Sequence, residues 1–264
     1  MSEPAGGTTP VIEARKISKH FGHVNALRDV DLHLGPSEVL GVVGDNGAGK
    51  STLMKILSGV HPASSGELLV EGSPVHFSNP GDARRLGIEM VYQDLALAGN
   101  MRIDENIFLG REQTRRVGPL SLVDHKANQA RAMGHLDNLK IHVKSVGQRV
   151  EELSGGQRQA VAVARATAFD AKVVIMDEPT AALAVKEVAK VLDLINGLRD
   201  KGISVILISH RLDDIFYVCD RVMALYHGRN FEEGTLDQIE RNEVVGWIMG
   251  NKSGAGVEDA VDHN

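Results

Sequence analysis

The spacing of apolar residues changes along the chain, and each change marks a different kind of structure. Residues 11–18 and 26–34 alternate partly between apolar and polar, as two half-buried strands joined by a turn at 21–23 would. Residues 94–150 show helical periods with no strong strand, whereas helices and short apolar strands alternate from residue 157 onward. Further expected strands are 39–43, 67–70, 75–77, 88–92, 172–176, 204–208 and 222–226, and expected helices are 52–58, 80–86, 103–109, 124–139, 157–169, 185–200 and 212–218.

This order of elements predicts an α/β fold with a mainly parallel sheet and helices on both faces. We expect one large domain over residues 11–250, with a small antiparallel β layer at its front and an inserted helical subdomain over residues 94–155. Residues 1–10 are small and polar, and residues 251–264 are glycine-rich and acidic. Both ends are therefore expected to be disordered tails.

Composition narrows the possible partners. The chain has 29 Lys and Arg against 35 Asp and Glu, a net charge of −6, with no basic run of the kind that neutralises nucleic-acid phosphates. Nucleic acid is therefore not an expected partner. Its single cysteine, Cys219, excludes an internal disulfide and fits a reducing compartment. The apolar runs are far shorter than the roughly 18 residues of a membrane span, so any membrane role is expected to go through a partner.

A glycine-rich segment between an apolar strand and an amphipathic helix fits the phosphate-binding pattern G-x-x-x-x-G-K-[ST]. Its backbone N–H groups and the helix N-terminus favour a polyphosphate, with Lys50 reaching the β- and γ-phosphates and the Ser51 hydroxyl holding Mg²⁺. A chance match in a glycine-rich chain is the alternative, and the flanking strand and helix argue against it. The segment is Gly44, Asp45, Asn46, Gly47, Ala48, Gly49, Lys50 and Ser51.

An acidic pair follows the apolar run 173–176. Asp177 ends the expected strand, where ligands bind in open α/β sheets, and can hold Mg²⁺ through water. Glu178, the next residue, can polarise an attacking water. Two acids at the start of an ordinary loop are the alternative for this pair taken alone.

The third motif is Leu153-Ser154-Gly155-Gly156-Gln157, directly before a helical run. A hydroxyl, bare backbone N–H groups and a helix dipole together can receive an anion. For Ser-Gly-Gly taken by itself, a plain helix N-cap with flexible glycines is the favoured interpretation.

Taken in this order, the three motifs resemble the nucleotide-binding subunit of ABC transporters over about residues 11–250, which implies a P-loop NTPase fold of ABC type. The resemblance makes Phe21 the aromatic that stacks on adenine and His210 the switch histidine at the γ-phosphate. Gln93 becomes the glutamine that joins the two subdomains and contributes to the Mg²⁺ site with Ser51 and Asp177. The implied catalytic residues are Lys50, Gln93, Glu178 and His210.

The resemblance also implies that two copies of the chain meet head to tail. Ser154 and Gly156 of one copy, with Gly155 and Gln157 beside them, would close over ATP held by residues 44–52 of the other copy, Thr52 included. ATP and Mg²⁺ are the implied ligands. One departure is Ala181-Ala182-Leu183-Ala184, because most of the superfamily has Asp where this chain has Ala184.

The same segment is similar to carbohydrate importers of the ribose, xylose and fructose class, most of all single-domain fructose import ATPases. This implies a permease partner contacted through residues 94–111, a sugar-binding receptor protein acting through the permease, and a peripheral position on the cytoplasmic face of the inner membrane. A soluble ABC ATPase acting on DNA or ribosomes is the alternative. The long coiled coil, zinc cysteines or second ATPase domain usual in such proteins are not present in this sequence.

Overall fold

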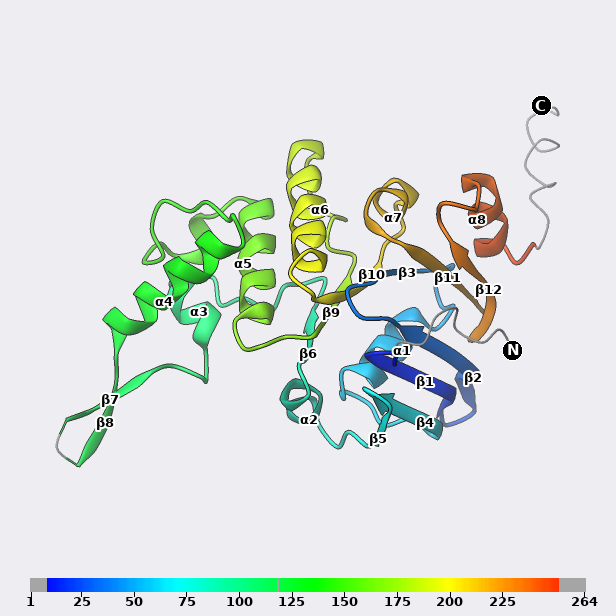
Figure 1. Ribbon diagram of the computed structural model, residues 1–264, viewed down its shortest axis with the longest axis horizontal. Coiled ribbons are helices and arrows are strands. Elements are labelled where there is room, and N and C mark those ends of the chain that lie inside the picture. The colour runs from blue at the N-terminus through cyan, green and yellow to red at the C-terminus, as the bar shows by residue number, and fades with distance from the viewer. Residues whose placement is uncertain (1–8, 118, 252–264) are drawn as a thin grey trace.

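The computed structural model describes residues 9–117 and 119–251. The tails expected at 1–10 and 251–264 fall almost wholly outside the described residues, and their disorder stays a prediction. The described chain forms two sheets, a two-stranded hairpin and a group of helices (Figure 1).

The larger sheet has six strands in the order β12-β11-β3-β10-β9-β6. Pairing is parallel throughout except between β11 and β12, which confirms the predicted mainly parallel sheet. These strands are β3 (Val39–Val43), β6 (Ile88–Val91), β9 (Val173–Asp177), β10 (Ser204–Ile208), β11 (Arg221–Tyr226) and β12 (Arg229–Thr235).

The central strands are buried on both faces. Successive side chains of a strand point to opposite sides, so neighbouring residues enter two different cores. Val174 and Val205 belong to a core shared with the helices α5 to α8, whereas Val173 and Ile206 belong to a second core on the other face. These helices are α5 (Gly155–Thr167), α6 (Val185–Arg199), α7 (Leu212–Val218) and α8 (Arg241–Ile248).

The second core is closed by α1 and the smaller antiparallel sheet, which has the order β2-β1-β4-β5. Leu53 and Met54 of α1 are fully buried there with Ile12 of β1. The elements are β1 (Ile12–Phe21), β2 (Val24–Leu34), β4 (Ser65–Val70), β5 (Ser73–Val75) and α1 (Lys50–Leu57), and α2 (Pro80–Arg85) leads into β6.

The inserted helical part contains a hairpin that the sequence pattern did not predict. It comprises α3 (Ile103–Phe108), β7 (Thr114–Val117), β8 (Leu120–Val123), α4 (His125–Asn138) and a 3₁₀ turn, η1 (Val150–Glu152). The sequence indicated no strong strand over 94–150, and it missed these two short ones. Every residue of β8 is exposed, so no buried face enforced a clear alternation of apolar and polar residues.

Other differences lie at element ends and in the last part of the chain. The first turn consists of Gly22 and His23 alone, because β1 continues through Phe21. Strand β5 ends at Val75, whereas the predicted strand ended at residue 77. Neither β12 nor α8 was predicted. β12 is a mostly polar strand paired only with β11, and α8 buries few side chains, so both carry a weak pattern.

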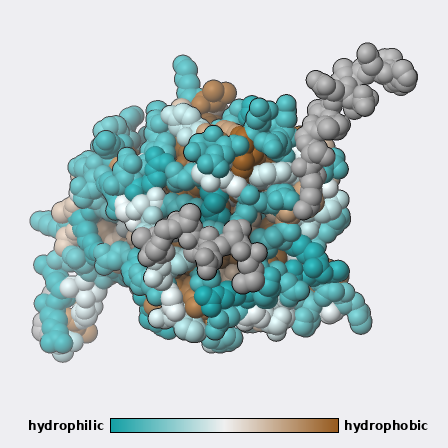
Figure 2. All heavy atoms as spheres, turned by 45° about the vertical axis from the view of Figure 1, so that its right-hand side comes forward, coloured by the Kyte–Doolittle hydropathy of each residue, from teal (hydrophilic) through white to brown (hydrophobic). Residues whose placement is uncertain are grey.

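The face of the molecule seen in Figure 2 is largely hydrophilic, with small hydrophobic patches and no apolar belt. Among the described residues, no helix combines the length and the apolar character that crossing a bilayer demands.

Candidate nucleotide site

Four sequence-predicted site segments meet along one edge of the parallel sheet. The phosphate loop follows β3, Gln93 lies two residues after β6, Asp177 ends β9, and His210 lies two residues after β10. Because β3, β10, β9 and β6 are successive neighbours in the sheet, their carboxyl ends form a continuous row. Ligands of open α/β sheets bind outside this edge.

The phosphate loop needs glycine at its first and last turn. Gly44 has a φ of 146° and Gly49 a φ of 102°. A Cβ on Gly44 would lie 2.3 Å from the carbonyl oxygen of Leu225, and one on Gly49 would lie 2.7 Å from Leu27 Cδ2. Only glycine therefore allows the loop to wrap tightly before α1 begins at Lys50. The remaining loop residues Asp45, Asn46 and Gly47 are exposed, Ala48 is buried, and Ser51 and Thr52 sit in the first turn of α1.

Lys50 is a buried cation whose ammonium group contacts backbone carbonyl oxygens. It is 7% exposed, and its Nζ donates to Gly44 O at 2.6 Å and Asp45 O at 3.0 Å. Burial lowers the pKa of Lys50, opposed by the negative charges of Glu178, Asp177 and Asp45. Within the part of the chain that the structure describes, Lys50 forms no ion pair, and its contacts are these two carbonyls. A polyphosphate would supply the missing counter-charge.

The acidic pair faces this cation from β9. Burial raises the pKa of Asp177, the adjacent Glu178 adds to the rise, and Lys50 opposes it. Glu178 Oε1 lies 2.6 Å from His210 Nε2. The backbone at Glu178 is left-handed, with a φ of 50°, and its N–H donates to Ile208 O at 2.9 Å. The structure therefore brings Glu178 and His210 together, as one unit at the sheet edge.

Gln93 and Phe21 lie nearer the solvent. Gln93 is exposed. It lies in a loop in which Leu95 and Ala96 have left-handed backbone. Phe21 is 46% exposed at the end of β1, with its ring edge against His61 at 5.6 Å and Lys19 Nζ at 5.0 Å from its centroid. Phe21 therefore remains partly accessible to a ligand, as an aromatic that stacks on a base must be.

Ser154 is the N-cap of α5, as the plain N-cap interpretation of this segment expects. The Gln157 N–H donates to Ser154 Oγ at 3.3 Å, and the Ser154 N–H donates to Gln157 Oε1 at 3.1 Å. This reciprocal capping box fixes the helix start. Helix α5 packs in the core on one face of the parallel sheet and α1 in the core on the other face, and the two helices are well apart in Figure 1, so the signature segment and the phosphate loop of one chain are separated.

A buried network that sequence reasoning missed holds the loop around His210. The Thr180 hydroxyl donates to Asp214, and the Ser209 hydroxyl lies 3.4 Å from the same carboxylate. Arg211 Nε is 3.4 Å from Asp214 Oδ1. Asp214 is 1% exposed. It therefore couples the segment after Glu178 to the segment that carries His210.

Replacing Asp214 with Ala should lower the free energy of unfolding by about 2–4 kcal/mol, because the buried Thr180 hydroxyl loses its acceptor. Urea unfolding measures the change. Asp213→Ala is the matched control, since Asp213 is the exposed neighbour in the same helix, and should cost well under 1 kcal/mol. Equal losses of unfolding free energy for the two variants would show that the Asp214 network does not stabilise the fold.

Arg165 is a second residue that the motifs did not reveal. Its guanidinium donates to Leu95 O at 2.8 Å and to Ala96 O at 2.6 Å, so α5 supports the strained loop after Gln93. Ala184, where most of the superfamily has Asp, is exposed and is the N-cap of α6 without a side-chain cap.

The fold and this site define a nucleotide-binding α/β protein with a phosphate loop, a buried lysine and an acidic strand end. Comparison with known families finds the ABC transporter family over residues 27–181. The xylose/arabinose import ATP-binding protein of Sulfolobus acidocaldarius is 47% identical over 89% of this chain and 92% of its own length. The fructose import ATP-binding protein of Rhizobium meliloti is 48% identical over 92% and 95%.

Two further comparisons complete the picture. The chain spans about half the length, 49%, of a ribose import ATP-binding protein of Streptomyces coelicolor, to which it is 43% identical. An ATP-binding cassette of an ABC transporter in its ADP conformation superposes with a TM-score of 0.76 at 26% identity, covering 92% of this chain and 96% of that one. The chain belongs to the ABC transporter family, as one of its ATP-binding, ATP-hydrolysing proteins.

Proposed function

We propose that this chain is the ATPase subunit of a membrane importer for a monosaccharide, working as a head-to-tail dimer. The observation that carries the proposal is Lys50, a cation buried at the phosphate loop whose ammonium group contacts carbonyl oxygens and, among the described residues, forms no ion pair. Similarity to the fructose and xylose/arabinose import proteins along nearly their whole length supports the sugar assignment.

In this proposal residues 44–52 hold the phosphates of ATP, Lys50 pairs with the β- and γ-phosphates, and Phe21 stacks on the adenine. The Ser51 hydroxyl, the Asp177 carboxylate and the Gln93 amide are hard oxygen donors, the ligand type that suits Mg²⁺. A cation beside Asp177 would also offset the burial that raises the pKa of this carboxyl. When bound, Mg²⁺ would neutralise charge on the phosphate oxygens.

Glu178 and His210 are proposed to carry out hydrolysis. Glu178 accepts the proton of the attacking water or orients it, and His210 keeps the carboxylate in place through the 2.6 Å contact. The same His210 Nε2 would hold the γ-phosphate, which requires it to exchange Glu178 for the phosphate oxygen. The pair is therefore a sensor of bound ATP as well as a base.

The separation of the two phosphate-facing segments supports the proposed dimer. The signature segment leads into α5, which packs in the core on one face of the parallel sheet, whereas the phosphate loop leads into α1, which packs in the core on the other face. The labels α5 and α1 are also well separated in Figure 1, so we do not expect the two segments of one chain to close on the same nucleotide. A second copy, turned head to tail, would present its signature segment to that loop. The γ-phosphate then bridges both chains by charge-assisted hydrogen bonds, and hydrolysis removes the bridge.

The permease is proposed to contact residues 94–111, at the cytoplasmic face of the membrane, and to receive sugar from a receptor protein outside. Asp104 in this segment is 1% exposed and paired with Arg102 at 3.0 Å, so its charge serves the fold. Leu109 is 52% exposed and offers an apolar side chain to a partner.

An uptake assay tests the function. Cells lacking this chain should lose uptake of one labelled monosaccharide among fructose, ribose and xylose. Wild-type protein should restore uptake, whereas Glu178→Gln should not, because import needs hydrolysis. Unchanged uptake of all three sugars would contradict monosaccharide import, and co-purification of the chain with ribosomes or DNA would favour the alternative class.

A further inference from the structure

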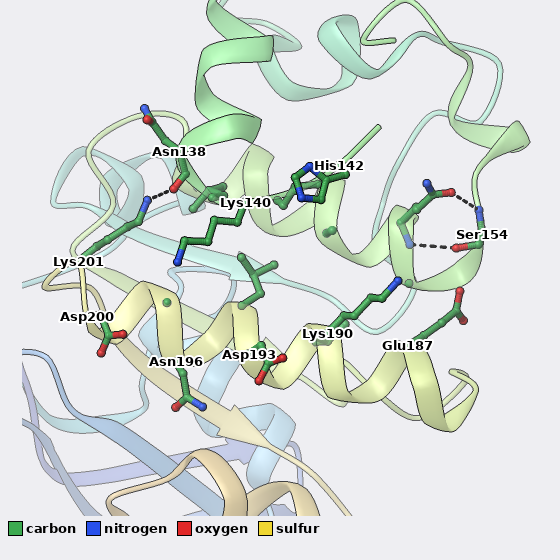
Figure 3. Close-up of a pocket in the computed structure, with 18 residues that line it drawn as sticks. Asn138, Lys140, His142, Ser154, Glu187, Lys190, Asp193, Asn196, Asp200 and Lys201 are labelled. Carbon is green, nitrogen blue, oxygen red and sulfur yellow. Dashed lines mark hydrogen bonds between the residues drawn. The ribbon is translucent and has the colours of Figure 1, made fainter. Parts of the chain in front are cut away.

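Glu187, in the first turn of α6, lies against the signature segment. An ideal Cβ on Gly156 would be 2.9 Å from Glu187 Cβ and 3.2 Å from its Cδ, and one on Gly155 would be 3.6 Å from Glu187 Oε2. Figure 3 shows Glu187 directed toward Ser154 at one end of an open groove of about 910 Å³ between α5 and α6. The glycines of the signature therefore leave room for this side chain.

The carboxylate interacts with groups that an incoming anion would use. Hydrogen bonds from the Ser154 hydroxyl and the Gly156 N–H hold the pKa of Glu187 below its usual value, so the group is anionic at neutral pH. Ser154 Oγ accepts from Gln157, which leaves the hydroxyl proton free to be donated. A negative charge at the N-terminus of α5 is also favoured by the helix dipole.

We propose that Glu187 occupies the anion site of the signature segment until the γ-phosphate of the partner's ATP displaces it, an inference that rests on the proposed head-to-tail dimer. Lys190, one turn further along α6, gives the displaced carboxylate a cation to pair with. The side chain is then an internal competitor that prevents closure without ATP. It sets how much ATP the dimer requires.

Removing the charge of Glu187 should make ATP-driven dimerisation easier. The experiment compares Glu178→Gln, which keeps ATP intact, with Glu178→Gln/Glu187→Gln by size-exclusion chromatography over a graded series of ATP concentrations. The double variant should reach half-dimer at about a tenfold lower ATP concentration, because no carboxylate competes for charge-assisted hydrogen bonds. Asp193→Asn is the matched control. It removes one charge from the same helix and groove, but its carboxylate accepts from Tyr217 instead.

The outcomes separate this inference from the proposed function. If Glu178→Gln dimerises with ATP but Glu187→Gln leaves the ATP requirement unchanged or raises it, Glu187 supports the signature segment and the inference is overturned. An equal shift with Asp193→Asn would also overturn it, since general charge would then be the cause. If Glu178→Gln neither binds ATP nor dimerises, the proposed function itself fails. Should Glu187→Gln unfold, Glu187→Ala, at an accessible helix position, provides the same comparison.

Discussion

Glu178→Gln should lower the rate of ATP hydrolysis by about 10²–10⁴-fold while leaving ATP binding intact. In the wild type, His210 Nε2 lies 2.6 Å from Glu178 Oε1. The glutamine amide keeps the shape of the side chain and an oxygen for this contact, but it cannot accept a proton from the attacking water. The variant should therefore accumulate as an ATP-bound dimer. Phosphate release measures the rate, and size-exclusion chromatography with MgATP measures the dimer.

Glu71→Gln is a matched control for this experiment. Glu71 also has left-handed backbone, with a φ of 50°, and its carboxylate pairs with Lys172 at 2.7 Å, at a residue with no proposed role in the site. Its hydrolysis rate should equal that of the wild type. If Glu178→Gln kept the wild-type rate, the general base would have to be sought elsewhere, and His210 would become the next residue to replace.

The phosphate loop and the sheet edge were predictable because each depends on a short segment. A strand, a glycine-rich turn and a helix N-terminus are neighbours in sequence, so residues 39–58 contain the whole loop. Asp177 and His210 follow apolar runs that were recognisable as buried strands, and parallel strands bring their carboxyl ends to one edge. Neither step required knowledge of distant contacts.

The supporting residues were not predictable in this way, because their roles exist only in the folded chain. Thr180 and Asp214 are 34 residues apart, and Arg165 reaches a carbonyl 70 residues away. Glu187 looks like any acid in a helical first turn until α6 packs beside α5. The hairpin of β7 and β8 escaped for another reason, since a fully exposed β8 shows no contrast between a core face and a solvent face.

Lys50→Met should separate ligand binding from stability, because the lysine charge is unfavourable to the free protein and favourable to the complex. Burial lowers the pKa of Lys50 from 10.5, so at neutral pH the folded state holds a charge that the unfolded state solvates better. Methionine has a similar length and no charge. Without nucleotide, we expect the free energy of unfolding to change by no more than about 1 kcal/mol, since the relieved desolvation offsets the lost bonds to Gly44 and Asp45.

ATP binding should respond in the opposite manner. Loss of the charge-assisted hydrogen bonds from Lys50 to the phosphates should weaken ATP binding by about 100-fold, as judged by titration with a fluorescent ATP analogue. Lys16→Met, which removes an exposed lysine paired with Asp31, should leave binding unchanged. If Lys50→Met bound ATP with wild-type affinity, Lys50 would not be part of the nucleotide site. If the variant lost more than about 3 kcal/mol of stability, Lys50 would have a structural role instead. Only a large loss of affinity with small loss of stability fits a cation held in place for a phosphate.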